Sequence, residues 1–203
     1  GIVTAIVGLR QIEVTLGGRQ NHAGTTPMDM RTDALRGLSD ADYAIRDALH
    51  AIVTPRSVWT IGHVAVHPNA PSAVPGRVRF TVQWRDADTP RLDRMEEAIR
   101  TALAQIAAAT GLSLTISATA RLPPADMDAG LRSALAAAAE THAPGRWCNM
   151  PAGMLFAPSI GGISHDFAED TSADDLVTCL HILKAAAATL TSRPVRSAGR
   201  SCP

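Results

Sequence analysis

The order of elements between residues 11 and 118 constrains the fold of this chain more than any other feature. Apolar and polar residues alternate over 11–17, 77–85 and 112–118, as in half-buried strands, and 57–67 also has the composition of a strand. Two stretches with helical periodicity lie between these strands. The order β-α-β-β-α-β predicts a four-stranded sheet with two helices on one face, the ferredoxin-like arrangement.

Both helices carry start signals in the sequence. Thr26 is a candidate N-cap, Pro27 would take the first helical position, and Asp29 would place an acid in the first turn. The first helix is therefore predicted to begin at Pro27. The second is predicted to begin at Thr89–Pro90 and to end at Gly111.

The sequence pattern changes after Leu122-Pro123-Pro124, which follow the last of these strands. An Ala-rich helix is predicted over about 126–140, a short buried strand over 154–157 and a Gly/Ser loop over 159–164. A last helix is predicted from Ser172, capped through Asp175, to about residue 191. The strand-loop-helix order is typical of part of an α/β domain.

The predicted domains follow from these patterns. Residues 1–9 and 121–191 are expected to form a partial α/β domain, into which 10–120 is inserted, and the polar tail 192–203 is expected to be disordered. The chain opens directly on the strand-like run 2–7 and has no initiating Met. We interpret it as the C-terminal portion of a longer polypeptide.

Charge and cysteine content limit the function classes. Lys plus Arg and Asp plus Glu both number 19, so binding to nucleic acid or to an acidic membrane has no long-range electrostatic basis. No apolar run is long enough to span a bilayer, and none has the flanks of a signal peptide. Cys148, Cys179 and Cys202 are scattered and are expected to be reduced thiols. A cytoplasmic protein is expected.

The first candidate site residue is His22, in a Gly-containing loop that leads toward a predicted helix N-terminus. Backbone N–H groups at such a position can hold an anion, and a histidine can polarise or protonate a carbonyl oxygen. The alternative is a loop histidine that bonds its own backbone.

The second candidate is His165, in the segment Gly161-Gly162-Ile163-Ser164-His165-Asp166, just beyond a predicted buried strand. Open α/β sheets bind ligands at this position, and His165 is a plausible metal ligand that Asp166 or Glu169 could orient. The alternative is a loop histidine with its hydrogen bonds satisfied locally.

Arg85, at the end of the predicted 77–85 strand, could hold a carboxylate with two parallel hydrogen bonds. The alternative is a surface ion pair with Asp86 or Asp88.

The remaining histidines are interpreted as structural. His63 and His67 share a strand face but lie roughly 13 Å apart, too far to chelate one ion. His50, His142 and His181 lie on helices or at their ends and have no neighbour at ligand spacing in the sequence.

Three segments together carry a resemblance to a known family: Gly17 to Leu35 (GGRQNHAGTTPMDMRTDAL), Pro68 to Gly76 (PNAPSAVPG) and Met154 to Glu169 (MLFAPSIGGISHDFAE). They resemble the hydantoinase/carbamoylase family of amidohydrolases, which includes N-carbamoyl-amino-acid hydrolases and allantoate amidohydrolases. The family belongs to the clan of dinuclear-metal exopeptidases. The resemblance runs from about residue 2 to residue 190.

The resemblance implies a catalytic α/β domain with an inserted βαββαβ lid that forms a homodimer. It implies that His22 helps stabilise the tetrahedral intermediate and that His165 ligates one of two divalent ions (zinc, manganese or cobalt). It also implies that Arg85 binds the substrate carboxylate, with help from Gly161 and Gly162.

Further implications concern the loop 68–76 and three departures from the family pattern. The PNA segment implies substrate contacts from Asn69 and from Ser72, which stands where the family has a second Asn. Gln83 replaces an Asp two positions before the substrate Arg. Residues 146–153 stand where the family has an SGAGHDA-like segment, and they do not contain that motif. The resemblance also implies that the other metal ligands and the general-base Glu lie upstream of residue 1.

The leading hypothesis is metal-dependent hydrolysis of linear amide, carbamoyl or ureido C–N bonds in a small substrate that bears a carboxylate. This chain alone is expected to be inactive. One alternative is an aminoacylase or dipeptidase of the same clan. The other is a non-catalytic remnant that serves as a dimerisation or ligand-binding module.

Overall fold

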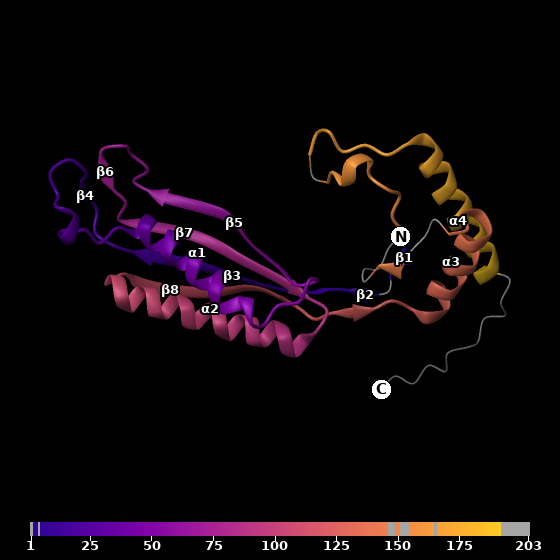
Figure 1. Ribbon diagram of the computed structural model, residues 1–203, viewed down its shortest axis with the longest axis horizontal. Coiled ribbons are helices and arrows are strands. Elements are labelled where there is room, and N and C mark those ends of the chain that lie inside the picture. Colours follow the sequence, from indigo (N-terminus) through magenta and orange to yellow (C-terminus); the bar gives the residue numbers. More distant parts are fainter. Residues whose placement is uncertain (1, 4, 146–148, 151–154, 165, 192–203) are drawn as a thin grey trace, which may run out of the picture. The chain divides into compact units, whose positions relative to one another are not determined.

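The structure, a computed structural model, describes residues 2–3, 5–145, 149–150, 155–164 and 166–191 (Figure 1). The chain divides into two compact units. Residues 7–124 form the sheet unit, and residues 1–6 with 125–203 form the helical unit. The tail predicted to be disordered lies outside the described residues.

The sheet unit has the predicted βαββαβ order. Its sheet has the strand order β5-β7-β3-β8, with every pair of neighbours antiparallel. The elements are β3 (Gly8–Gly17), α1 (Ala34–His50), β5 (Val58–His67), β7 (Arg77–Asp86), α2 (Thr89–Thr110) and β8 (Ser113–Leu122). The predicted mixed α/β fold with a ferredoxin-like sheet is confirmed.

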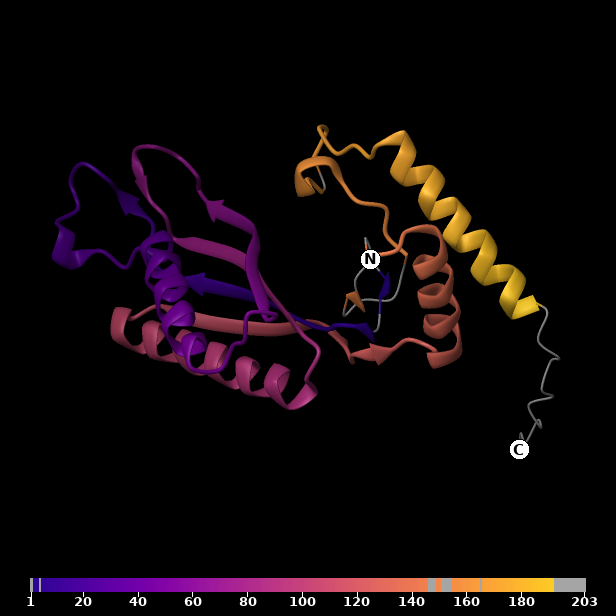
Figure 2. The same ribbon diagram turned by 45° about the vertical axis from the view of Figure 1, so that its right-hand side comes forward.

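Both helices cover the same face of this sheet (Figures 1 and 2). Alternate residues of β7 point into the core beneath them and are fully or almost fully buried: Val78, Phe80, Val82 and Trp84. The Trp84 indole Nε1 donates a hydrogen bond to the Leu92 carbonyl at 3.1 Å, which satisfies its one polar group in the core. On the opposite face, β7 carries mainly polar side chains: Arg77, Arg79, Thr81, Gln83 and Arg85.

The predicted start of the first helix is wrong. Pro27 precedes only a short 3-10 helix, Met28–Met30, and α1 begins at Ala34. The Asp33 carboxylate accepts hydrogen bonds from two backbone N–H groups of the first turn of α1, which is the N-cap arrangement. The Thr26 hydroxyl instead donates to the His22 carbonyl at 2.8 Å and closes a loop.

The second helix agrees with its predicted limits. α2 begins at Thr89, and the Asp88 carboxylate accepts a hydrogen bond from the backbone N–H of Arg91. Gly111 follows the helix with a φ of 69°, a left-handed conformation that glycine adopts without strain.

The helical unit consists of short strands and two helices. Strand β1 (Ile2–Val3) pairs in parallel with β10 (Asn149–Met150), and β2 (Ala5–Ile6) pairs antiparallel with β9 (Ala125–Asp126). Its helices are α3 (Ala129–His142), a 3-10 turn at Ile160–Gly162, and α4 (Ala173–Thr191). The core is built mainly of small side chains and comprises Ile2, Ala134, Leu135, Ala138, Ala139, Ala143, Ile182 and Ala186.

One prediction for the helical unit is confirmed and one is wrong. The Ser172 hydroxyl bonds the Asp175 carboxylate and accepts from the Asp175 N–H, as the predicted cap requires. The strand predicted over 154–157 is not present at 155–157, and Met154 lies outside the described residues. Leu155 forms one isolated bridge to Ile2, and Phe156 is 43% exposed. A two-residue strand such as β1 offers few partners for a longer ladder.

None of the helices in the described part of the chain is long and apolar enough to cross a bilayer.

Candidate functional site

His22 lies on an arm that extends beyond one end of the sheet (Figure 1). The arm, residues 18–31 and 68–76, is held by pairing between β4 (Asn21–His22) and β6 (Ala73–Val74). The Gly18 N–H donates to the Gly76 carbonyl at 2.8 Å at its base. The loop predicted to contain His22 is therefore a two-stranded projection with a defined backbone.

The hydrogen bond to the His22 ring fixes which ring nitrogen of the neutral side chain carries the proton. The Gly24 N–H donates to Nδ1 at 3.0 Å, so a neutral His22 carries its proton on Nε2. A Cβ at position 24 would lie 3.2 Å from Cε1 of the ring, so a larger residue there would require the ring to shift slightly. His22 is exposed and presents an N–H donor to any ligand that reaches it.

Arg31 is a part of the arm that sequence reasoning missed. Its Nε and Nη2 donate to the Thr26 carbonyl at 3.0 and 2.9 Å, and Nη2 also donates to the Ala23 carbonyl at 2.6 Å. Thr26 in turn donates through its N–H and its hydroxyl to the His22 carbonyl. The only sequence signal for Arg31 was its place within the family-like segment, because the acceptors it uses are backbone carbonyls.

Asn69 and Ser72 lie on the same arm as His22. The Ser72 carbonyl accepts a hydrogen bond from the Ala23 N–H at 2.9 Å, directly beside the His22 pairing. Asn69 has a φ of 55°, in the left-handed region that asparagine tolerates better than most residues. Both side chains are exposed, so the fold brings His22, Asn69 and Ser72 together.

Arg85 lies near the opposite end of β7. Its Nε and Nη2 both donate to the Gln83 amide oxygen Oε1, at 3.0 and 2.9 Å. The alternative of an ion pair with Asp86 or Asp88 is not found. The Arg85 side chain is exposed on the polar face of the sheet, where it could bind an anion.

Asp86 is buried and belongs to a structural network. Burial by itself would raise the pKa of its carboxyl, but hydrogen bonds from the Ser57 hydroxyl, the Asp88 N–H and Arg91 outweigh burial and lower the pKa below its ordinary value. The contact with Arg91 Nη1 is 2.9 Å. Asp86 therefore fixes the start of α2 and leaves Arg85 without a carboxylate partner.

The third candidate region lies in the helical unit. Gly161 and Gly162 have φ values of 70° and 71° in the 3-10 turn, so both need glycine. His165, the predicted metal ligand, lies outside the described residues. The Asp166 carboxylate accepts from the Ala168 N–H at 2.9 Å within a local turn. Within the residues that the structure describes, no group of three or more His, Cys, Asp or Glu could hold a metal ion.

The structure does bring two histidines together that sequence reasoning treated as isolated. The rings of His142 on α3 and His181 on α4 have centroids 5.9 Å apart and planes inclined at 44°. Their separation of 39 positions along the chain hid this neighbourhood, which depends on the packing of the two helices.

The sheet unit defines the class of protein. A family model described as a peptidase dimerisation domain matches residues 4–111, which include the arm, α1, β5, β7 and α2. The relatives of the chain narrow this class.

Among curated proteins, the chain is 33% identical to the N-carbamoyl-L-amino-acid amidohydrolase of Rhizobium meliloti, over 86% of this chain and 45% of that protein. It is 31% identical to the allantoate amidohydrolase of Escherichia coli K12, over 87% of this chain and 46% of that protein. Among solved structures, a hydantoinase/carbamoylase family amidase from Burkholderia vietnamiensis matches with a TM-score of 0.84 and 33% identity, over 96% of this chain and 50% of that one.

The chain belongs to the hydantoinase/carbamoylase family of amidohydrolases, within the group that carries the peptidase dimerisation domain. It spans about half the length of the curated relatives that it matches.

Proposed function

We propose that this chain takes part in metal-dependent hydrolysis of a linear C–N bond in an N-carbamoyl-amino-acid or allantoate-like substrate, and that each active site uses residues of two copies. The observation that carries the second part of the proposal is the position of His22 and Arg85 at opposite ends of one sheet.

The register of the sheet gives the distance between the arm end of β7 and Arg85. Gly17 pairs with Arg77 at the arm end of β7, and Leu9 pairs with Arg85 at the other end. The strand from 77 to 85 spans roughly 26 Å at the usual rise per residue. His22 lies beyond the Arg77 end, so His22 and Arg85 of one copy cannot both contact a small substrate. A second copy, related by a two-fold axis, could supply the missing partner.

The chemistry of the two groups is complementary. The Arg85 guanidinium could bind a substrate carboxylate and so orient the bond to be broken. The Nε2–H of His22 could donate to the oxygen that gains negative charge in the tetrahedral intermediate. Asn69 and Ser72, which share the arm with His22, would contact the same substrate, and the backbone around Gly161 and Gly162 would help hold its carboxylate.

The proposal includes a centre of two divalent ions, zinc, manganese or cobalt, with His165 as the ligand from this chain. When bound, such ions polarise the scissile carbonyl and lower the pKa of a water. The remaining ligands and the general base would come from outside the described residues.

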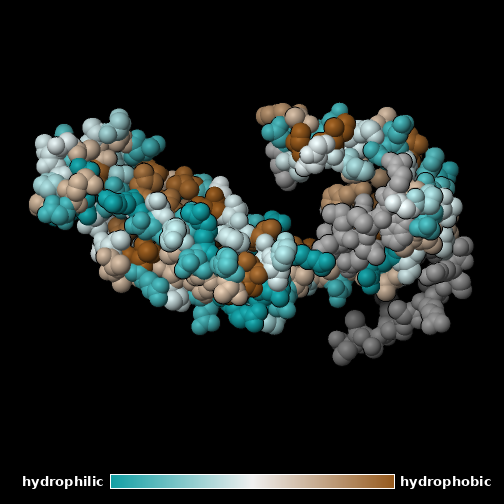
Figure 3. Space-filling view, viewed as in Figure 1, coloured by the Kyte–Doolittle hydropathy of each residue, from teal (hydrophilic) through white to brown (hydrophobic). Residues whose placement is uncertain are grey.

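The surface proposed for dimerisation is formed by α1 and the edge strand β5. A groove of about 560 Å³ between them is lined by Leu35, Leu38, Ser39, Asp42, Trp59, Thr60 and Ile61. Figure 3 shows apolar side chains gathered along β5. Two residues of this strand, Val58 and Val64, are 55% and 46% exposed. Strand β5 carries no Lys, Arg, Asp, Glu or Pro, whereas the other edge strand, β8, carries Arg121. An edge without such residues is suited to pairing with a second copy.

A dimerisation or ligand-binding module without catalysis is the second candidate function. It is favoured by the contrast between a complete sheet unit and the lack of a metal-ligand cluster in the described part of the chain. An aminoacylase or dipeptidase activity would use the same groups, so substrate profiling distinguishes it from the leading proposal.

The decisive experiment uses the complete reading frame that contains this chain, supplied with Zn²⁺ or Mn²⁺ and a panel of N-carbamoyl amino acids and allantoate. His22→Ala and Arg85→Ala should each abolish hydrolysis. Because each variant retains the group that the other lacks, a mixed dimer has one intact site, and random pairing should restore roughly a quarter of the native rate.

Arg94→Ala on α2 serves as the control, because Arg94 is exposed, lies outside the proposed dimerisation surface of α1 and β5, and its side chain has no hydrogen bond or ion pair among the described residues. It should leave the rate unchanged. Mixed variants that stay inactive would contradict the two-copy site, and a native protein that hydrolyses none of the panel would contradict the function. The 203-residue chain assayed alone should show no turnover.

A further inference from the structure

A chain of hydrogen bonds crosses three strands on the polar face of the sheet and ends on Arg85. We call Thr119, Gln11 and Gln83 the amide relay. The Gln11 side-chain Nε2 donates to the Thr119 hydroxyl at 2.9 Å, and the Gln83 Nε2 donates to the Gln11 Oε1 at 2.8 Å. The Gln83 Oε1 then accepts both bonds from Arg85.

The direction of each bond in the amide relay is fixed by its neighbours. The Thr119 hydroxyl donates to the Gln11 backbone carbonyl at 3.3 Å, so its oxygen is left to accept from the Gln11 amide. That orients the Gln11 Oε1 toward Gln83, which must then turn its NH₂ group to Gln11 and its oxygen to Arg85. A flipped Gln83 amide would face the Arg85 donors with its own N–H groups.

The partner that the amide relay offers to Arg85 is neutral. Asp86, the next residue, is buried and bonded to Ser57 and Arg91. Glu13, which lies on the same polar face, has an ion pair with Arg79 at 3.9 Å. Within the described part of the chain, no carboxylate compensates the positive charge of Arg85.

The hydrogen bonds to Gln83 leave other N–H donors of the Arg85 guanidinium available. Gln83 occupies the Nε–Nη2 edge of the guanidinium, so both N–H groups of Nη1 and the second N–H of Nη2 remain. One N–H of Nη1 and the second N–H of Nη2 lie side by side at the end of the guanidinium, and this pair matches the two oxygens of a carboxylate. Arg85 is thus oriented through one edge and open at the other.

We propose that Gln83 determines the preference of this site for an anionic substrate, because it orients Arg85 without neutralising its charge. Gln11 and Thr119 are positioning residues, since they keep the Gln83 oxygen turned toward Arg85. The inference rests on the proposed role of Arg85 in carboxylate binding. A substrate with a free carboxylate is favoured over its uncharged amide, which gains nothing from the uncompensated charge.

The variant Gln83→Glu isolates the charge. A glutamate keeps the length of the side chain and an oxygen for Arg85, but it adds a negative charge that competes with the ligand. Binding is measured on the ¹⁵N-labelled 203-residue chain by titration with N-carbamoylglycine, followed at the Arg85 Nε–H resonance. N-carbamoylglycine amide is the uncharged probe.

The native chain should bind the carboxylate probe at least about tenfold more tightly than the amide probe, a difference of the size of one charge-assisted contact. Gln83→Glu should weaken binding of the carboxylate probe roughly tenfold. It should leave the affinity for the amide probe unchanged. Added salt should weaken carboxylate binding by the native chain, and it should have less effect on the variant.

Two further variants test the amide relay itself. Thr119→Val and Gln11→Leu keep the charge of the site but remove the bonds that orient Gln83. Each should broaden or shift the Arg85 Nε–H resonance before any ligand is added, and each should weaken carboxylate binding by a smaller factor than Gln83→Glu. A role in stability alone would leave the free Arg85 resonance in place.

The proposal is overturned if Gln83→Glu binds the carboxylate as tightly as the native chain, or if the native chain does not distinguish the two probes. Should Gln83→Glu fail to fold, Gln83→Met, which removes the acceptor without adding charge, must lose the native Arg85 resonance, and an unchanged resonance also overturns the proposal. These measurements need neither metal nor turnover, so a failure of the proposed hydrolysis leaves them interpretable.

Discussion

The sheet unit and the helical unit differ in how completely they bury their apolar side chains. In the sheet unit, α1 and α2 direct one apolar stripe each into a shared core with β3 and β7. In the helical unit, Ile182 and Ala186 of α4 are buried, yet another face of the same helix is apolar and exposed. That face comprises Leu176, Val177, Leu180 and Leu183, each 51–61% exposed.

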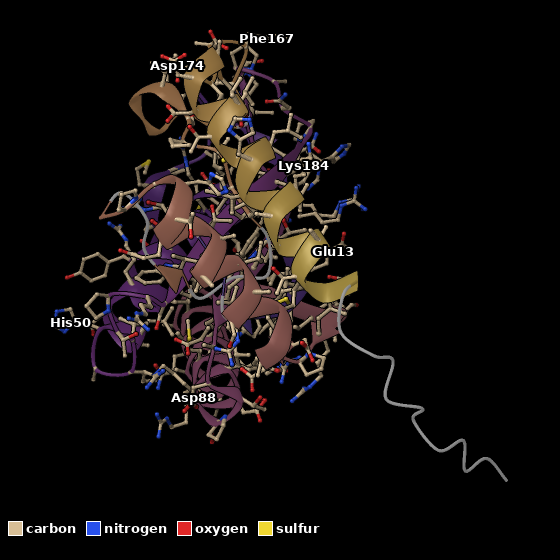
Figure 4. All side chains as sticks on the ribbon, turned by 90° about the vertical axis from the view of Figure 1, so that its right-hand side faces the viewer. Glu13, His50, Asp88, Phe167, Asp174 and Lys184 are labelled. Atoms are coloured by element: carbon tan, nitrogen blue, oxygen red, sulfur yellow. The ribbon has the colours of Figure 1, made fainter. Side chains whose placement is uncertain are left out.

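Figure 4 looks onto α4, with Lys184 labelled on it, and shows Phe167 at the far end of the unit, where it is fully exposed. A helix with apolar side chains on more than one side is typical of an element packed on both sides. The paired strands β1 and β10 are two residues long, whereas parallel sheets are normally larger and covered on both faces. The sheet unit therefore contains its own stabilising core, and the helical unit presents surface suited to further packing.

The largest expected effect concerns the core of the sheet unit. Trp84→Ala removes a fully buried side chain and its hydrogen bond to Leu92, so the free energy of unfolding of the sheet unit should fall by about 3–5 kcal/mol. Urea unfolding followed by circular dichroism measures this loss. Leu135→Ala in the helical unit is the counterpart, and an equal loss of sheet-unit stability from it would break the distinction between the units.

The next effect concerns the buried carboxyl of Asp86. Because its pKa is lowered in the folded state, its contribution to stability is present above the unfolded pKa of about 3.9 and is lost as pH falls through the folded value. Asp86→Asn should cost about 1–3 kcal/mol at neutral pH. The native chain should be more stable than the variant at neutral pH, and this difference in the free energy of unfolding should disappear at acidic pH. An equal difference at both pH values would contradict the assignment.

A smaller effect is expected in the arm. Arg31→Ala removes three hydrogen bonds to the carbonyls of Ala23 and Thr26 and should destabilise this loop locally by about 1–2 kcal/mol. Hydrogen exchange at the Gly24 N–H, which bonds the His22 ring, should become roughly tenfold faster. Arg36→Ala is the matched control, and unchanged exchange in Arg31→Ala would show that the loop is held by other contacts.

The smallest effect on stability is expected on the exposed face of α4. Leu180→Asp should change the free energy of unfolding by no more than about 0.5 kcal/mol, because the side chain is 61% exposed. It should nevertheless reduce the fluorescence of a bound hydrophobic dye, which the native chain is expected to bind through this face and the neighbouring Phe156. Lys184→Gln on the same helix should have no effect. A native chain that binds no dye would contradict the conclusion that the helical unit exposes more apolar surface than the sheet unit.

The fold of the sheet unit could be predicted because its signals are local. The alternation of apolar and polar residues predicted the buried positions of β7, and α2 begins at Thr89 and ends before Gly111, as the sequence predicted. The start of α1 was mispredicted because Thr26 and Asp33 are both acceptable caps in sequence. Only the arm, which uses the Thr26 hydroxyl to close a loop on His22, decides between them.

The sequence by itself determined the order of elements, the family, and the identities of His22 and Arg85 as candidates, because each depends on residue types at fixed spacing. Tertiary structure alone decided that the two lie at opposite ends of one sheet and that Arg85 meets the neutral Gln83 and not Asp86. It also decided that Gln11 and Thr119, far apart in sequence, stand behind Gln83. The physical reason is that a sheet joins residues by register across strands, and register depends on the packing of the whole unit.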